Sequence, residues 1–312
     1  GSDFQYLPFQ TYPGGHVLWT TAVAGREEHP PFGGGETIYN VIDVRQSYLQ
    51  RIVVESLRLL GHPEEAERSI HFSYEMVALS PRCAAEMGIP VGEEEASRPF
   101  LEMSGRKGVG VKADDLVDIL VRKALEEVTL RNPSLEPGRR QEVALKIAVG
   151  ALRYYMLRFT RNKIIAFDFT DALSFDGETG PYVQYAVVRS AGILAKVMAA
   201  EKVPEADLAG RAAGADLAFL SASPCGEEWE LLSLLGRHRG TLEQAVSSLE
   251  LSGLAKYAFV LAQKFNAFYH KHPVLQETDP DRKWGRVLLT YLFRERMTRL
   301  LDLMGIPIPP LM

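Results

Sequence analysis

The chain has 312 residues, of which 46% are hydrophobic and 24% charged, so it is long enough for two domains and has the composition of a globular protein. Its longest apolar runs are short and interrupted by charge, which predicts no membrane-spanning segment, and its net charge of −5 counts mildly against a nucleic-acid-binding protein. Its two cysteines, Cys83 and Cys225, lack zinc-ligand spacing, which argues against structural zinc and a disulfide scaffold and predicts a reduced, cytosolic setting.

The first third of the chain mixes strand-like and helix-like segments. Residues 38–44 are β-branched and apolar, which is typical of a buried parallel strand, and residues 46–60 have helical periodicity that stops at Gly61. Residues 70–79 form a second strand-like run. A strand, a helix and a strand in this order predict a doubly wound α/β sheet.

After a helix predicted for residues 114–130, the pattern becomes almost purely helical. One helix is predicted beyond Arg139, and a short extended piece at residues 164–169 follows it. Four further helical segments are then predicted, at residues 181–201, 227–239, 241–272 with a break near Gly253, and 280–304. The Ala/Gly-rich stretch 206–218 is predicted to be an exposed connection. The chain therefore changes from α/β to an all-α bundle.

The helix that begins near residue 180 presents two aromatic side chains and a cation together. Thr179 can cap this helix, and Pro181 suits its first turn. Tyr182, Tyr185 and Arg189 fall at i, i+3 and i+7 and therefore share one face. Two aromatic rings beside a guanidinium make a surface on which an unstacked RNA base can stack. The alternative is that both tyrosines are half-buried core residues with exposed hydroxyls.

The loop at residues 103–111, Met-Ser-Gly-Arg-Lys-Gly-Val-Gly-Val, is the strongest catalytic candidate. Its glycines let consecutive N–H groups turn toward an anion, while Ser104, Arg106 and Lys107 add a hydroxyl and two positive charges. Such a loop suits a triphosphate whose charge is redistributed in the transition state, although it lacks the Walker A spacing. The alternative is a flexible surface loop.

A second candidate site lies at the end of the strand predicted for residues 38–44. Ligands of open α/β sheets bind beyond the carboxyl ends of the strands. The Asp43 carboxylate and the Gln46 amide oxygen could accept the N–H donors of an arginine side chain there. The alternative is that Asp43 caps the helix that follows.

Several of these segments resemble the arginyl-tRNA synthetases, a family of class I aminoacyl-tRNA synthetases. Residues 180–186, Gly-Pro-Tyr-Val-Gln-Tyr-Ala, are similar to the start of the family's anticodon-binding domain, and residues 103–108 are similar to its signature loop. Residues 41–47, Val-Ile-Asp-Val-Arg-Gln-Ser, resemble the segment whose glutamine contacts the substrate arginine. Residues 265–270 resemble a further helix of the anticodon-binding domain, and residues 305–312 resemble the family's C-terminus beside the anticodon.

The resemblance implies a role for individual residues. In the signature loop, Glu102 and Gly105 stand where the usual lysines would be, so we expect Lys107, helped by Arg106, to neutralise the pyrophosphate leaving group. The implied catalytic residues are Met103, Ser104, Arg106, Lys107 and Gly108. The implied arginine-binding residues are Gln46 and Asp43. The implied tRNA-binding residues are Tyr182, Tyr185, Arg189, Asn266, His270 and Met312.

The fold class that the resemblance implies is α/β followed by all-α. Residues 1–112 would be the second half of a Rossmann-type catalytic domain, residues 113–172 a helical stem-contact region, and residues 173–312 an α-helical anticodon-binding domain. The implied activity is a cytoplasmic, ATP-dependent attachment of arginine to tRNA(Arg) through arginyl-adenylate. ATP would be a substrate together with Mg²⁺, and no metal bound by the protein itself is expected.

The family's His-Ile-Gly-His motif does not occur in these 312 residues. We therefore expect this chain to represent the C-terminal portion of such a ligase and to form no adenylate alone. The alternative is a free-standing, non-catalytic tRNA-binding protein derived from the same family. Half of a Rossmann sheet would expose an edge, which a missing N-terminal half or a second copy of the chain would cover.

Overall fold

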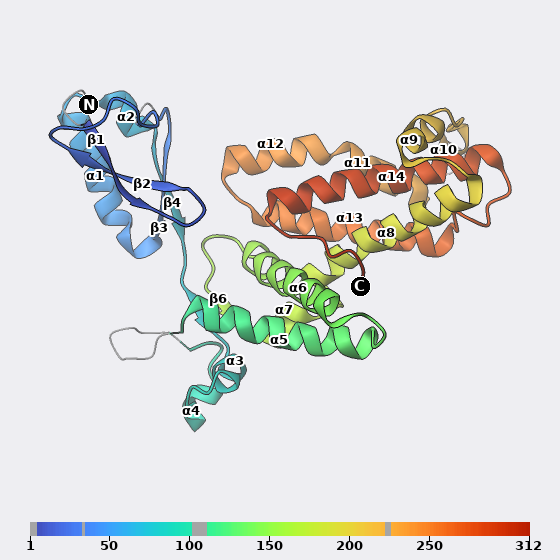
Figure 1. Cartoon of the computed structure of the whole chain (residues 1–312), viewed down its shortest axis with the longest axis horizontal. Helices are drawn as coiled ribbons and strands as arrows, with labels where there is room; N and C mark the ends of the chain where they lie inside the picture. The colour runs from blue at the N-terminus through green and yellow to red at the C-terminus, as the bar shows by residue number, and fades with distance from the viewer. Residues whose placement is uncertain (1–4, 33–34, 102–110, 222–225) are drawn as a thin grey trace. The chain divides into compact units, whose positions relative to one another are not determined.

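The computed structural model describes residues 5–32, 35–101, 111–221 and 226–312 (Figure 1). Contacts within the chain divide it into two compact units, Gly1–Ser73 and Tyr74–Met312. This division by contacts does not test the functional domain boundaries expected at residues 112 and 172, which stay predictions.

The first unit consists of short strands and two helices. In chain order its elements are β1 (Gln5–Thr11), β2 (Val17–Ala22), β3 (Ile38–Asp43), the 3-10 turn η1 (Val44–Gln46), α1 (Ser47–Leu59), α2 (Pro63–Glu67) and β4 (Ser69–Tyr74), which ends at the boundary. β1 and β2 pair antiparallel, and β3 pairs with β4. Every described residue of this unit except Ala66 is at least partly exposed, so the unit has almost no core of its own.

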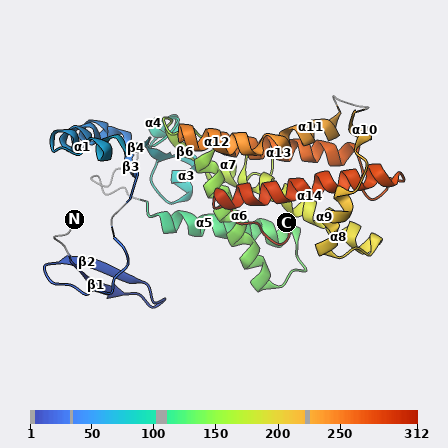
Figure 2. The ribbon, with the colours of Figure 1, turned by 90° about the horizontal axis from the view of Figure 1, so that it is seen from above.

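The second unit is mainly helical. In chain order its elements are β5 (Val77–Leu79), α3 (Pro81–Glu86), α4 (Glu93–Ala96), α5 (Ala113–Arg131), α6 (Pro137–Leu157), β6 (Ile165–Phe167), α7 (Phe169–Leu173), α8 (Gly180–Glu201), α9 (Glu205–Ala213), α10 (Ala218–Ser221), α11 (Glu227–Gly236), α12 (His238–Ser248), α13 (Ser252–Lys271) and α14 (Pro280–Leu303). β5 and β6 pair in parallel. α13 and α14 run alongside each other, as do α5 and α6, in both views (Figures 1 and 2).

Two hydrophobic clusters hold this unit together. The larger one contains residues of every helix from α8 through α14, together with Tyr154 of α6. In it the rings of Phe265 on α13 and Phe293 on α14 stack with their centroids 4.0 Å apart. The smaller one joins β5, α3, α5, α6, β6 and α7 around Phe167 and Phe169. Leu311 and Met312, at the C-terminal end of the chain, pack against the smaller cluster. The C-terminal tail therefore reaches from the bundle to the α5–α7 region.

α8 begins as the sequence predicts. The Thr179 hydroxyl accepts a hydrogen bond from the Tyr182 N–H at 3.3 Å, and Pro181 occupies the first turn. Gly180 is required for a different reason, because a Cβ at this position would collide with the backbone of Gly150 on α6. By length and composition α8 could cross a membrane, but ten of its 22 residues are buried against the rest of the chain, as in a core helix.

Three sequence predictions differ from the structure. The stretch 206–218 is not an exposed connection, since α9 occupies most of it and buries Leu208 and Ala212 completely. The run 70–79 is two strands, β4 and β5, in different sheets. The strand predicted to be buried at residues 38–44 is not buried, because Ile38, Tyr39 and Val41 are each more than half exposed. The break expected near Gly253 is confirmed, because α12 ends at Ser248 and α13 begins at Ser252, with Leu249 at a left-handed φ of 54°. The described strands form three two-stranded sheets, so the Rossmann sheet stays a prediction.

Candidate functional site

Four of the predicted tRNA-binding residues form one hydrogen-bonded group between α8 and α13. Arg189 Nη1 donates to Asn266 Oδ1 at 2.8 Å, and its Nη2 donates to the Tyr185 hydroxyl at 3.1 Å. Asn266 Nδ2 donates to the Tyr182 hydroxyl at 3.1 Å. The guanidinium carbon of Arg189 also lies 4.6 Å from the centroid of the Tyr185 ring. This geometry fixes the orientation of both tyrosines before any ligand binds.

The two tyrosines differ in what surrounds their rings. Tyr182 packs on the core, with its ring centroid 5.4 Å from that of Phe259, which agrees with the half-buried alternative. Tyr185 is also half-buried, but its side chain lines a cavity of about 430 Å³. Of the two tyrosines, Tyr185 is therefore the one whose side chain lines this cavity, whereas the Tyr182 ring packs on the core.

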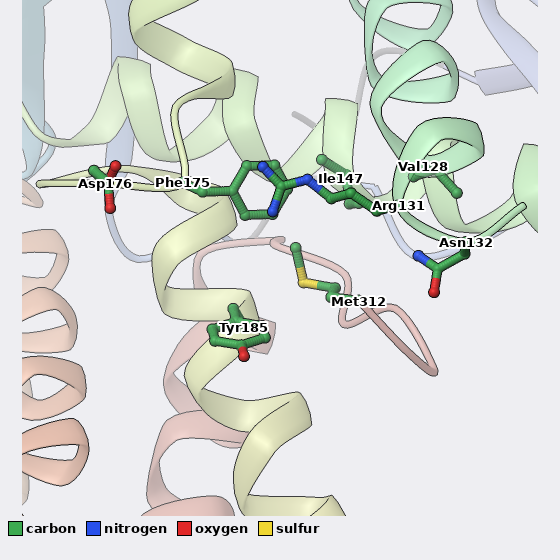
Figure 3. Close-up of a pocket in the computed structure, with 8 residues that line it drawn as sticks. All are labelled: Val128, Arg131, Asn132, Ile147, Phe175, Asp176, Tyr185 and Met312. Atoms are coloured by element: carbon green, nitrogen blue, oxygen red, sulfur yellow. The ribbon is translucent and has the colours of Figure 1, made fainter. Parts of the chain in front are cut away.

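The cavity beside Tyr185 combines apolar walls with polar groups (Figure 3). Its lining residues are Val128, Arg131, Asn132, Ile147, Phe175, Asp176, Tyr185 and Met312. The Arg131 guanidinium lies 4.4 Å from the Phe175 ring centroid, and Figure 3 shows the Met312 side chain between Tyr185 and this pair. A flat ring with donors and acceptors on its edge fits such a lining, because aromatic and apolar walls take its faces and amide, carboxylate and guanidinium groups meet its edge.

His270 lies one turn beyond Asn266 on α13 and is exposed. Among the described residues, it is not a member of the hydrogen-bonded group of Tyr182, Tyr185, Arg189 and Asn266. The cations near it are paired with α11. Lys264 Nζ lies 2.7 Å from Glu230 Oε2, and Lys271 pairs with Glu227. The hydrogen bond from Lys271 lowers the pKa of the Glu227 carboxyl to about 2. These pairs reduce the positive charge that this end of α13 presents.

The arginine-binding candidates lie in the first unit. Asp43 Oδ1 accepts hydrogen bonds from the backbone N–H of Arg45 at 2.8 Å and from its Nε at 2.9 Å, so Asp43 caps η1. The Arg45 side chain lowers the pKa of the Asp43 carboxyl to about 2. Gln46 is exposed at the end of η1. A cavity of about 540 Å³ in this unit is lined by other residues, Ser47 and His71 among them.

The catalytic candidates Met103, Ser104, Arg106, Lys107 and Gly108 lie outside the described residues. Within the described ranges, no group of three or more His, Cys, Asp or Glu side chains could hold a metal ion.

The sequence analysis named only two of the eight residues that line the cavity, Tyr185 and Met312. Arg131 and Asn132 end α5, and Phe175 and Asp176 precede α8, so both pairs are distant in sequence from Met312. In the sequence, Asn132-Pro133 indicated only the end of a helix and gave no sign of a binding site. Only the packing of α5 and α6 against α8 and the tail places these side chains together.

Comparison with known proteins shows which family the chain resembles. Residues 183–312 match the family described as the DALR anticodon binding domain. The arginine–tRNA ligases of Thermococcus sibiricus and Deinococcus radiodurans are 34% and 33% identical to the chain over 299 and 318 residues, which are 95% and 99% of its length. The chain is homologous to the C-terminal portion of arginine–tRNA ligases. It spans less than half of these relatives, 42% and 47% respectively.

Solved structures of arginyl-tRNA synthetases share the fold. That of Thermus thermophilus aligns with 99% of the chain and 46% of its own length, with a TM-score of 0.74 and 30% identity. That of Plasmodium falciparum aligns with 89% of the chain and 41% of its own length, with a TM-score of 0.65 and 14% identity, which shows the fold alone. The DALR region begins inside α8 and includes Tyr185, Arg189, Asn266, His270 and Met312.

Proposed function

We propose that this chain docks tRNA(Arg) as the C-terminal portion of an arginine–tRNA ligase. The observation that carries the proposal is the cavity beside Tyr185, which brings together Tyr185 and Met312, two residues of the DALR match. The complete protein would join arginine to tRNA(Arg) in the cytoplasm through arginyl-adenylate. ATP would be consumed as a substrate, with Mg²⁺ as the counterion of its phosphates.

The cavity would receive an unpaired base from the anticodon loop. Sequence-specific RNA recognition takes bases that are free of the stack, places them against aromatic side chains and reads their edges by hydrogen bonds. Tyr185 offers the ring, and Arg189 holds that ring in place through its cation–π contact and hydrogen bond. Asn132 and Asp176 supply an amide and a carboxylate at the cavity lining, so the base edge would be read there.

The remaining site residues are proposed from the family resemblance. Gln46 would contact the substrate arginine, while Asp43, whose carboxylate already holds Arg45, would shape the turn that presents Gln46. Lys107 and Arg106 would neutralise the pyrophosphate leaving group. These roles define what the first unit and the predicted loop at residues 103–111 would contribute to the ligase.

Binding of tRNA(Arg) tests the docking proposal directly. The full chain should bind a tRNA(Arg) transcript more tightly than a transcript of the same body with an exchanged anticodon loop, with both measured at one salt concentration because phosphate contacts depend on salt. A transcript whose acceptor stem alone is changed is the matched control. Equal affinity for all three transcripts would contradict anticodon-loop docking.

A free-standing, non-catalytic tRNA-binding protein derived from the same family is the second candidate. The gene upstream of Asp3 distinguishes the two. A continuous reading frame with a His-Ile-Gly-His motif supports the ligase, and a start codon at that point supports the binding protein. ATP–pyrophosphate exchange with arginine and tRNA adds a biochemical test: we expect no turnover from this chain alone, and clear turnover would contradict that expectation.

A further inference from the structure

A buried glutamine connects the cavity helix to the C-terminal tail. Gln184 precedes Tyr185 on α8 and is completely buried. Its Nε2 donates to the backbone carbonyl of Lys146 on α6 at 2.9 Å and to that of Pro307 at 2.6 Å. Because both neighbours are carbonyl oxygens, which only accept, the amide nitrogen must face them. One side chain thus joins α6, α8 and the tail.

The space for this amide comes from a missing side chain. A Cβ at Gly150 on α6 would collide with the amide group of Gln184. The other amide atom, Gln184 Oε1, is buried without a hydrogen-bond partner among the described residues. An unpaired buried oxygen costs free energy that an apolar side chain of the same size would avoid. This cost indicates that the site needs the donors of the amide and not merely its volume.

The tail depends on few other polar contacts. α14 is followed by Gly305, whose φ of 65° lies in the left-handed region, and the Ile306 N–H donates to the Leu301 carbonyl at 2.8 Å. Among the described residues, the Gln184 amide makes the one hydrogen bond from a side chain to the backbone of residues 307–312. Five residues further on, Met312 lines the cavity beside Tyr185.

We propose that Gln184 is a positioning residue that fixes the tail at Pro307 and thereby places Met312 in the cavity. Tyr185 and Gln184 are consecutive on α8, so one helix presents the ring to the cavity and the amide to the tail. The consequence for RNA rests on the proposed function, because it assumes that the cavity receives a base. The placement of Met312 itself does not depend on that assumption.

The methyl signal of Met312 tests the placement without RNA. The protein would be labelled at its methionine methyl groups and studied by NMR, and the signal that disappears in Met312→Ala is assigned to Met312. In Gln184→Met, this Met312 signal should move to the chemical shift of a solvent-exposed methionine. Ser190→Ala is the matched control, because it removes another buried hydrogen bond of α8 that the tail does not share. An unmoved Met312 signal in folded Gln184→Met would overturn the proposal.

Binding of tRNA(Arg) then tests the consequence. Loss of the hydrogen bond should weaken binding about ten-fold in Gln184→Met. Met312→Ala in that background should add less than about two-fold, because contacting residues that act together are not additive. Fully additive losses would overturn the positioning role. A displaced Met312 signal with unchanged tRNA affinity would instead leave the positioning intact and contradict the proposed function.

The unmodified protein offers a measurement that does not depend on any variant folding. Nuclear Overhauser contacts between the Gln184 side-chain amide protons and the protons of Pro307 and Ile308 are expected from the 2.6 Å hydrogen bond. Their presence supports the anchoring of the tail, and their absence would overturn it.

Discussion

Replacing Tyr185 by alanine should weaken tRNA(Arg) binding without unfolding the helical unit. The side chain lines the cavity and accepts one hydrogen bond from Arg189. If a base stacks on the ring, its removal should cost about 1–3 kcal/mol of binding free energy, as base–aromatic stacking does elsewhere. That range corresponds to roughly 5- to 150-fold in Kd.

Tyr185→Phe separates the ring from the hydroxyl. It keeps the stacking surface and removes only the hydrogen bond with Arg189, so we expect a loss of about 1 kcal/mol or less. Both variants would be measured by fluorescence anisotropy with labelled tRNA(Arg) at one salt concentration, together with urea unfolding of the free proteins.

The opposite pattern would refute the reasoning. If Tyr185 were a core residue, Tyr185→Ala would lower the free energy of unfolding by about 3–5 kcal/mol, as large-to-small core substitutions do. Retained tRNA affinity together with that loss of stability would show that no base stacks on this ring.

Three further predictions concern stability and titration. Arg286→Met should lower the free energy of unfolding by about 3–5 kcal/mol in urea, because Arg286 is only 6% exposed and loss of its guanidinium leaves the carboxylates of Glu228 and Glu277, each 2.6 Å away, without their arginine partner. The Asp43 carboxyl should titrate at about pH 2 by NMR, and Arg45→Ala should return it toward its ordinary value of 3.8; since the pKa is depressed, the stabilisation is complete above pH 4 and lost as the pH falls toward 2. Gly180→Ala should lower the free energy of unfolding by at least about 1–3 kcal/mol, because the methyl group of the new alanine would collide with the α6 backbone.

Local signals in the sequence predicted the long helices of the second unit closely, but not the short helices α3, α4, α7, α9 and α10. The cap at Thr179 and the proline that follows place the start of α8 within one residue, and the apolar periodicity of residues 280–304 gives α14. The prediction of an exposed connection at residues 206–218 was wrong because alanine and glycine give little apolar periodicity, although Leu208 is completely buried. Alanine is a strong helix former, and Leu208 and Ala212 pack this helix into the larger hydrophobic cluster.

The candidate site was predictable in part. Spacing placed Tyr185 and Arg189 on one face, and the structure joins them by a hydrogen bond. Nothing in the spacing indicated that Asn266, 77 residues later, would complete the group, or that Phe175 and Asp176 would line the same cavity. Contacts of this kind depend on how helices pack, which the local pattern of one chain does not encode.

The unequal cores of the two contact units determine what an unfolding experiment reports. Among the described residues of Gly1–Ser73 only Ala66 is buried, whereas Tyr74–Met312 contains both hydrophobic clusters. Unfolding followed by helical circular dichroism therefore describes mainly the second unit, and backbone hydrogen exchange should be faster in the first. Of the three tryptophans, only Trp19 belongs to the first unit, so replacing Trp229 and Trp284 leaves a fluorescence probe for the opening of that unit alone.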